Sequence, residues 1–344
     1  MSEAGVARLP LAHTPTPIVR VRLPLPSSPG VATRSEVEIW IKRDDITSGP
    51  EAGNKIRKLE YLLADARAKG ADTLITCGGI QSNHARATAI LGAQLGMKSV
   101  LMLRTLDPTL DPANAPFNGN VFLDKLVGAQ IRLITPAQYR ERTALMAEVA
   151  DALTREGKRP YVIPEGGSNG LGAFGYIRCM AEVRKQLDLG LAGEGAFDIV
   201  FHACGSGGTA AGVALGAARS EVAKEVRAIA VCDDAPTFER VIHRIIDEAR
   251  AIDPTLPAAP ARLIVDDTAK GPAYAIASDA QKAFIIEVAR ATGLLFDPVY
   301  TGKALFALRE AAARGELDGK RVLFLHTGGL PGLLAQADDF RGLV

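Results

Sequence analysis

Short apolar segments alternate with segments of helical periodicity along most of the chain. Strand-like apolar runs occur at 73–77, 99–103, 130–134 and 161–164, and again at 198–203, 226–231, 294–296 and 322–326. Helical patterns separate the first four runs, at 82–95, 117–127 and 137–157. Alternating apolar and polar residues at 37–42 predict one further, half-buried strand. This order of elements is typical of an α/β protein with parallel sheets wrapped by helices.

Three segments of the chain predict loops or extended chain instead. Residues 1–35 are rich in Pro, Thr and Ser, and the sequence HTPTP at 13–17 predicts extended, non-helical chain. A glycine-rich loop is predicted at 165–170, and a loop rich in Pro, Ala and Asp at 252–261.

An amphipathic helix is predicted between the turn-forming segment 48–50 and Gly70. Lys55 and Lys58 lie three positions apart, so they share a face near the helix N-terminus, where free N–H groups and the helix dipole favour an anion. One lysine could take part in catalysis while the other binds a phosphate. A solvated basic face is the alternative, because lysines are mostly surface residues.

Three of the predicted strands end in unusual polar sequence, at the edge where parallel sheets bind ligands. In GGIQSNH at 78–84, Ser82 or Asn83 is a good N-cap, and the free N–H groups beside it suit a carboxylate; a simple capped helix is the alternative. GSGGT at 205–209 predicts an anion cradle, and because it lacks a Walker lysine and dinucleotide spacing, a phosphomonoester is favoured. HTGGLPG at 326–332 could hold a heteroatom of a bound ring or form an ordinary turn.

Length, charge and cysteine content narrow the class of protein. A chain of 344 residues allows two ordinary domains or one large one, and a net charge of +1 gives no basis for binding nucleic acid or an anionic membrane. A small-molecule ligand is therefore favoured. The four cysteines lie far apart without metal-ligand spacing, which predicts core thiols, a reducing compartment and no metal. Without a membrane-spanning apolar run or a signal pattern, the protein is predicted to be cytoplasmic.

Taken together, five motifs resemble, in the same order, those of the D-cysteine desulfhydrase and 1-aminocyclopropane-1-carboxylate (ACC) deaminase family. They are GNK at 53–55, QSNH at 81–84, GSGGT at 205–209, DPVYTGK at 297–303 and HTGG at 326–329, and the resemblance covers about residues 13 to 340. Members are pyridoxal-phosphate enzymes of fold type II, the tryptophan synthase β type.

The resemblance implies a fold and an assembly. The expected α/β fold has two open, twisted, mostly parallel sheets flanked by helices. A large cofactor-binding domain would comprise 1–56 and 163–344, and a small substrate-side domain 57–162. The expected assembly is a homodimer.

The resemblance also implies roles for individual residues. Lys55 matches the lysine that forms the Schiff base with the cofactor, and Lys58 the lysine beside its phosphate. Asn83 matches the asparagine on the cofactor's phenolic oxygen, Ser82 the serine that faces the substrate, and Thr327 a hydroxyl on the pyridine nitrogen. The phosphate loop matches Gly205, Ser206, Gly207, Gly208 and Thr209. Two substrate-side tyrosines match Tyr300 and, in a looser alignment, Tyr274.

Two positions distinguish the branches of this family. In ACC deaminases the active-site tyrosine is followed by Glu and the Ser-Asn pair by Gln, whereas Thr301 and His84 follow here, as on the desulfhydrase side. One departure affects substrate choice. The family usually has two glycines before Asn-Lys, but this chain has Ala52-Gly53, preceded by Pro50-Glu51.

The expected reaction is α,β-elimination from a β-substituted amino acid. A lysine with a lowered pKa serves first as an amine nucleophile and then as the base that removes the α-proton, here Lys55. The loop Ser82-Asn83-His84 would hold the substrate carboxylate, with Tyr300 and Thr301 also at the substrate. Tyr300 and Tyr274 would protonate or position the leaving group, although either of them, and Tyr274 more readily, could instead be a packing residue with its hydroxyl at the surface. D-Cysteine would give pyruvate, sulfide and ammonia.

Other functions remain open on the sequence alone. Within the cofactor class they are ACC ring opening, elimination from another substrate such as L-cysteate, and β-replacement. A different class would be a nucleotide-binding protein that uses 205–209 without pyridoxal phosphate. His202, His243 and His326 are predicted to be structural.

Overall fold

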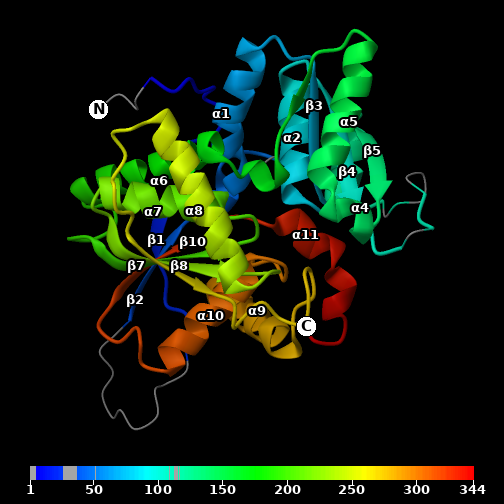
Figure 1. Cartoon of the computed structure of the whole chain (residues 1–344). Coiled ribbons are helices and arrows are strands. Elements are labelled where there is room, and N and C mark those ends of the chain that lie inside the picture. The colour runs from blue at the N-terminus through cyan, green and yellow to red at the C-terminus, as the bar shows by residue number, and fades with distance from the viewer. Residues whose placement is uncertain (1–4, 26–36, 51, 108, 112–114, 116) are drawn as a thin grey trace.

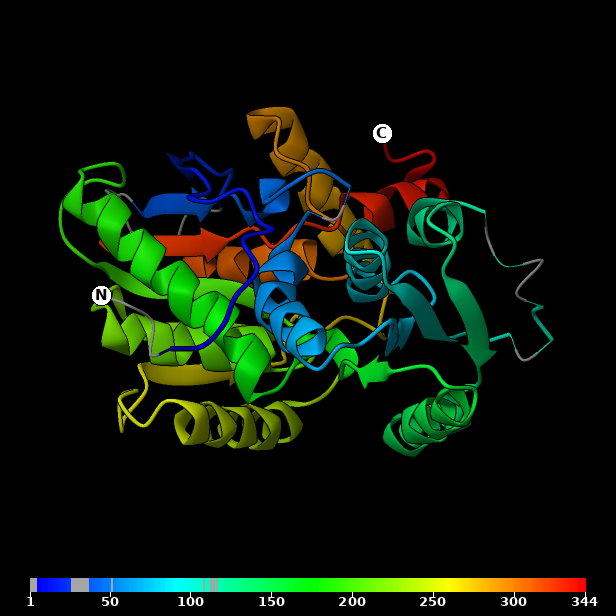
Figure 2. The same cartoon turned by 90° about the horizontal axis from the view of Figure 1, so that it is seen from above.

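The computed structural model describes residues 5–25, 37–50, 52–107, 109–111, 115 and 117–344. Its strands form two open sheets that lie side by side (Figures 1 and 2). Among the described residues, the larger sheet has six strands in the order β1-β2-β10-β7-β8-β9, and the smaller has four in the order β5-β4-β3-β6. β1 pairs antiparallel with β2, and the other pairings are parallel. Both sheets therefore have the predicted, mostly parallel α/β form.

The large sheet is covered by helices on both faces. Its strands are β1 (Ile18–Arg20), β2 (Glu38–Lys42), β7 (Phe197–Cys204), β8 (Ala223–Ala230), β9 (Arg262–Asp266) and β10 (Arg321–Leu325). One face packs on α6 (Gly170–Asp188), α7 (Gly208–Arg219) and α8 (Ala235–Ile252), and the other on α9 (Asp279–Thr292) and α10 (Thr301–Ala313). Burial on both faces explains why β7 and β10 read as nearly continuous apolar runs.

The small sheet is built in the same way. Its strands are β3 (Thr73–Gly79), β4 (Lys98–Arg104), β5 (Gln130–Ile134) and β6 (Pro160–Val162). One face packs on α1 (Asn54–Ala68) and α2 (Asn83–Gln94), with α3 (Gly119–Leu126) beside them, and the other on α4 (Pro136–Arg140) and α5 (Arg142–Arg155). Helix α1 also packs on α6, so it joins the two sheets (Figure 1). The predicted domain boundaries at 56–57 and 162–163 remain a prediction, and α1 spans the first of them.

The structure corrects three sequence-based expectations. The run 294–296 is not a strand; it is irregular chain whose Phe296 packs edge-on against Phe324, so its apolar character reflects burial without strand pairing. β9 begins directly after the expected loop 252–261 and had not been predicted. The helix expected at 137–157 is two helices, α4 and α5, that meet at Glu141. The segment 13–17 is non-helical, as expected.

The cysteines only partly fit the expectation of core thiols. Cys77, Cys179 and Cys204 are buried, whereas Cys232 is partly exposed, and all four are free thiols. In the part of the chain that the structure describes, no helix has the length and apolar character needed to cross a membrane.

Candidate active site

A cavity of about 480 Å³ lies where the carboxyl ends of strands from the two sheets face each other. Loops after β3, β7 and β10 form much of its wall, together with the first residues of α1 and the residue before α10. This is the place where parallel sheets bind ligands. It brings together most of the predicted site residues, namely Lys55, Ser82, Asn83, His84, Gly205, Ser206, Gly207, Thr209, Tyr274, Tyr300 and Thr327.

Lys55 enters the cavity from the first turn of α1. Gly53 precedes the helix with φ +113°, a conformation that favours glycine, and a Cβ there would lie 2.8 Å from the Thr327 carbonyl oxygen. The Asn54 N–H donates to the same oxygen at 3.1 Å, which fixes the start of α1 against the end of β10. Burial lowers the pKa of the Lys55 amine to about 8, although Cys204 and Glu165 act in the opposite direction.

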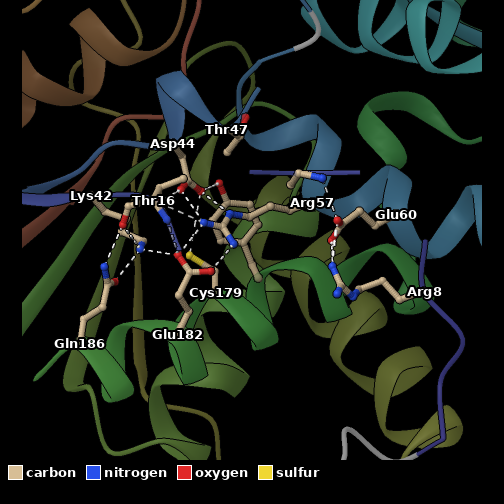
Figure 3. Close-up of polar contacts among 12 residues, drawn as sticks. Arg8, Thr16, Lys42, Asp44, Thr47, Arg57, Glu60, Cys179, Glu182 and Gln186 are labelled. Carbon is tan, nitrogen blue, oxygen red and sulfur yellow. Dashed lines mark hydrogen bonds and ion pairs between the residues drawn. The ribbon is translucent and has the colours of Figure 1, made fainter. Parts of the chain in front are cut away.

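The opposite face of α1 is held by a buried ionic network (Figure 3). Residues two apart on a helix point in different directions, so Arg57 faces away from Lys55. The Arg57 guanidinium contacts Asp44 Oδ1 at 2.8 Å and Glu182 Oε2 at 3.0 Å, and Lys42 Nζ contacts Glu182 Oε1 at 2.5 Å. Two cations therefore balance two carboxylates, and burial of the ion pairs ties α1 to β2 and α6.

The glycine-rich loop between β7 and α7 forms an anion cradle. Gly207 is the N-cap residue of α7 with φ +81°, and as a glycine it has no side chain to cap the helix. α7 has 12 residues, and its N-terminus, the positive end of the helix dipole, lies at the cavity. Ser168 Oγ accepts from the Gly208 N–H at 3.2 Å and lies 2.8 Å from Ser206 Oγ, so hydroxyl groups surround the same point.

Lys58 lies behind this cradle and is not part of the cavity wall. Its Nζ donates to the Gly166 carbonyl at 3.1 Å and to Ser168 Oγ at 3.3 Å, and it would touch a Cβ placed on Gly208 at 3.0 Å. Burial, followed by repulsion from Lys55, holds the pKa of Lys58 well below its usual value. An anion in the cradle would favour the charged form of Lys58.

The loop after β3 presents the start of α2 to the cavity. Ser82 is the N-cap residue, and its Oγ accepts from the Ala85 N–H at 3.2 Å. Asn83 Oδ1 accepts from Asn120 Nδ2 at 3.0 Å, which leaves the Asn83 amide N–H groups available as donors. Sequence reasoning missed Asn120, because nothing in the sequence places α3 beside this loop.

His84 is fixed by β3 through its side chain. The Thr76 hydroxyl donates its proton to the Ile163 carbonyl at 2.9 Å. The Thr76 oxygen also lies 2.9 Å from His84 Nε2, so it accepts a hydrogen bond from the Nε2–H group. Burial, with Lys55 and Lys58 adding to it, holds the pKa of His84 well below its usual value, so the ring is neutral. A carboxylate at this loop would therefore meet backbone N–H groups rather than a charged imidazole.

Tyr274 and Tyr300 form a hydrogen-bonded pair in the cavity wall. Their hydroxyl oxygens lie 2.7 Å apart and their rings meet edge to face. Burial raises the pKa of Tyr274 to about 12 and that of Tyr300 well above its usual value, so both keep their protons at neutral pH. The alternative with the Tyr274 hydroxyl at the surface does not fit this geometry.

Thr301 is not brought to the cavity. It is buried, and its hydroxyl donates to Asp297 Oδ1 at 2.6 Å, which secures the first turn of α10. Thr301 was expected at the substrate side, but it lies behind Tyr300 and does not line the cavity.

Comparison with known proteins identifies the family. The model of a family described as pyridoxal-phosphate dependent enzyme matches residues 10–328. The chain is also 41% identical over 340 residues to the bifunctional D-cysteine desulfhydrase/1-aminocyclopropane-1-carboxylate deaminase, mitochondrial, of Arabidopsis thaliana, with 97% of this chain and 81% of that protein covered. It belongs to the D-cysteine desulfhydrase/ACC deaminase family. This match favours the pyridoxal-phosphate interpretation over a nucleotide-binding one.

Other members support the same assignment. The D-cysteine desulfhydrase of Serratia proteamaculans is 39% identical over 303 residues, covering 87% of this chain and 88% of that protein. A solved structure described as an ACC deaminase homologue superposes with a TM-score of 0.84 at 34% identity, covering 99% and 97% of the two chains. The protein is thus a pyridoxal-phosphate dependent lyase with the fold of this family.

The residues of this family member fit the cofactor. An amine with a lowered pKa can bind an aldehyde, and the start of α7, with the Ser206 and Thr209 hydroxyls, suits a phosphate ester. Asn54 Nδ2 donates to Thr209 Oγ1 at 3.1 Å, which links the lysine helix to the cradle. Sequence reasoning missed Ser168, although it lies in the glycine-rich loop that was predicted at 165–170.

Proposed function

We propose that this protein catalyses α,β-elimination from a small β-substituted amino acid, with D-cysteine as the expected substrate and pyruvate, sulfide and ammonia as products. Bound pyridoxal phosphate would supply the electron sink for the negative charge at the α-carbon. The observation that carries the proposal is Lys55, whose amine faces a cavity that also contains an anion cradle and a pair of tyrosine hydroxyls.

Lys55 is proposed as the residue that holds the cofactor and moves the α-proton. A pKa of about 8 leaves a substantial neutral fraction of the amine near physiological pH, and only the neutral form is nucleophilic or basic. Lys58 is proposed to pair with the phosphate, together with Gly205, Ser206, Gly207, Gly208 and Thr209. Asn83 is proposed to donate to the phenolic oxygen and Thr327 to contact the pyridine nitrogen.

The start of α2 is proposed to hold the substrate carboxylate. The N–H groups at this helix N-terminus face the cavity, and a carboxylate is stabilised there by the helix dipole. Ser82 is proposed to face the substrate, and its Oγ, which accepts from Ala85, keeps its own proton free to donate.

The tyrosine pair is proposed to protonate or position the leaving group. Of two hydroxyls that share one hydrogen bond, one retains a proton that it can donate to another atom. A departing thiolate at this point would receive that proton and leave as hydrogen sulfide. Tyr300 is the better donor site, since it follows the Asp297 turn and also contacts the phosphate loop at Gly205.

ACC ring opening is the second candidate, because the Arabidopsis relative carries both activities in its name. Thr301 and His84 stand at the two positions that separate the branches, and neither side chain is directed at the cavity as a donor. The loop that departs from the family pattern ends at Ala52, whose carbonyl accepts from Arg86 at 2.8 Å, while Glu51 lies outside the described residues.

Release of ammonia and a 2-oxo acid from a panel of D- and L-cysteine, β-chloroalanine and ACC tests the proposal. The 2-oxo acid is pyruvate from cysteine and β-chloroalanine, and 2-oxobutanoate from ACC. We expect release from D-cysteine and from β-chloroalanine, and loss of both in Lys55→Ala. The matched control is Lys69→Ala, which removes an exposed lysine from the far end of the same helix and should leave the rates unchanged. Release from L-cysteine alone, or from ACC alone, would show that the D-cysteine assignment is wrong.

We further propose a cytoplasmic homodimer that binds a small amino acid and neither nucleic acid nor membrane. The family resemblance and the net charge of +1 support this proposal. Light scattering that gives twice the chain mass of 36.3 kDa would support the dimer, and a mass of one chain would contradict it.

A further inference from the structure

Lys303 ends the DPVYTGK motif at 297–303, and the proposed reaction assigns it no role. It lies in the first turn of α10, three residues after Tyr300, and its side chain is fully buried. Lysines are almost never fully buried unless the amine has binding partners. The partners of this amine therefore indicate its role.

The Lys303 amine binds three backbone carbonyl oxygens. Its Nζ donates to the Lys270 carbonyl at 2.6 Å, to that of Ala273 at 2.9 Å and to that of Val231 at 3.3 Å. An ammonium group has three N–H donors, so the donors and these acceptors match in number. Burial lowers the pKa of Lys303 to about 8, so the amine is mostly charged at pH 7.

Two of these carbonyls belong to the loop that carries Tyr274. The loop, residues 267–278, connects β9 to α9 and is irregular chain apart from a single bridge between Ala273 and Ile276. Most of its residues are at least partly exposed. A segment with so few buried contacts and backbone hydrogen bonds depends for its order on the side chains that bind it. The third carbonyl, that of Val231, directly follows β8, so Lys303 links the loop to the large sheet.

Lys303 is the charged member of a small set of side chains that bind this loop. Gln281 Nε2 donates to the Ala269 carbonyl at 2.7 Å, and Gln336 Nε2 donates to the Ala275 carbonyl at 2.9 Å. Each amide nitrogen binds one loop carbonyl, whereas the ammonium binds two. Hydrogen bonds from a charged donor are also stronger than neutral ones, so loss of Lys303 should loosen the loop most.

The two tyrosines of the cavity wall are held in different ways. The Tyr300 N–H donates to Asp297 Oδ2 at 2.8 Å, which fixes Tyr300 at the start of α10. Tyr274 lies in the loop, directly after the Ala273 carbonyl that Lys303 binds. Because Lys303 extends from the same helix turn that follows Tyr300, it ties both tyrosines to one support. The 2.7 Å contact between their hydroxyls therefore depends on this amine.

We propose that Lys303 is a positioning residue that holds Tyr274 against Tyr300 through the loop 267–278. It acts through Tyr274 and is not itself part of the cavity wall. This inference rests on the proposed elimination, in which the tyrosine pair serves the leaving group. Hydrosulfide from D-cysteine takes up a proton as it leaves, whereas chloride from β-chloroalanine takes up none. Placement of the pair should therefore matter for D-cysteine and much less for β-chloroalanine.

The kinetic test compares kcat/KM for the two substrates at pH 7 in the wild-type protein, Lys303→Met, Tyr274→Phe and the double variant. Methionine retains an unbranched apolar stem and removes the ammonium. We expect Lys303→Met to lower kcat/KM for D-cysteine by about ten- to a hundredfold, the effect of a misplaced group, and for β-chloroalanine by less than about threefold.

The double variant shows whether Lys303 acts through Tyr274. Two residues that act through one contact are not additive, so Lys303→Met should lower the D-cysteine value by less than about threefold once Tyr274 is Phe. Losses that multiply in the double variant would overturn the inference. An equal loss on both substrates in Lys303→Met would also overturn it, since Lys303 would then support the fold as a whole.

Amide hydrogen exchange, followed by mass spectrometry of peptides, gives a readout that needs no turnover. Peptides from 267–278 should exchange faster in Lys303→Met than in the wild-type protein, while peptides from α1 should be unchanged. The matched control is Lys282→Met, which removes a partly exposed cation that pairs with the exposed Asp279 on the neighbouring α9. It should alter neither exchange nor turnover. Equal exchange of 267–278 in Lys303→Met and the wild-type protein would overturn the inference.

A second variant covers the case in which Lys303→Met does not fold. Lys303→Ala prepared in ammonium chloride offers space for an ion with the same N–H donors as the lost group. Exchange of ammonium for tetramethylammonium, which has no N–H, should speed exchange of 267–278 and lower D-cysteine turnover, and no change would overturn the inference. If the wild-type protein releases pyruvate from neither substrate, the proposed elimination fails, while faster exchange in the variant would still show that Lys303 holds the loop.

Discussion

Lys55 depends on the contacts around it for its chemical character. An exposed lysine is almost fully protonated at neutral pH, and a protonated amine can neither attack an aldehyde nor accept a proton. Two features favour the neutral amine here: burial in the cavity wall and a position at the positive end of the α1 dipole. The sequence placed Lys55 at a helix start but contained no measure of its burial.

The first prediction concerns the pH dependence of cofactor attachment to the apoprotein. The pKa of Lys55 is lowered to about 8, so the reactive neutral amine increases as pH rises through that value and is nearly complete above about pH 9. The rate constant for attachment, followed by visible absorbance after adding pyridoxal phosphate, should therefore rise to a plateau. A rate that continues to increase up to the usual lysine pKa near 10.4 would contradict the lowered value.

Other residues of the site could not be assigned from sequence, because their partners are distant along the chain. The Asn83 carbonyl oxygen is bound by Asn120, and the tyrosine pair joins Tyr274 to Tyr300.

At the scale of elements, the apolar pattern predicts burial better than it predicts strand pairing. The helix between 48–50 and Gly70 is α1, and most strands lie within one to three residues of their expected bounds. The run 294–296 has the apolar pattern of a strand because Phe296 fills the core, yet its backbone joins no sheet. Conversely, β9 is a short edge strand that follows a proline-rich loop, so its pattern is weak.

The second prediction, at the scale of elements, concerns the network that ties α1 to β2 and α6. Arg57→Met would leave the buried Asp44 and the partly buried Glu182 with one cation, Lys42, between them, and removal of one partner from a buried ion pair typically costs about 3–5 kcal/mol. We expect a loss of that size in the free energy of unfolding, measured by urea denaturation at neutral pH.

The control for this experiment lies on the same helix. Lys69 pairs with Asp65 at an exposed position, and such pairs contribute at most about 1 kcal/mol, so Lys69→Met should have a small effect. Similar losses in both variants would show that the buried network does not hold α1 more firmly than a surface pair does.

At the scale of the molecule, the site exists because two separate sheets direct their carboxyl ends at one cavity. Lys55 and Gly205 are about 150 positions apart in the chain, and strand-end reasoning was sufficient to predict that they meet. That reasoning treats every polar strand end alike. It could not show that Lys58 lies behind the cradle and Thr301 behind Tyr300, because side-chain direction is set by packing between the sheets.

The central claim is that Lys55, rather than the neighbouring Lys58, holds the cofactor in the cavity. Borohydride reduction of the protein purified with its cofactor, followed by peptide mapping by mass spectrometry, tests the claim most directly. We predict one phosphopyridoxyl group per chain, located on Lys55, because among the residues that the structure describes it is the one lysine that lines the cavity. A label on Lys58 or on any other lysine, or no label in a protein that releases pyruvate, would contradict the account.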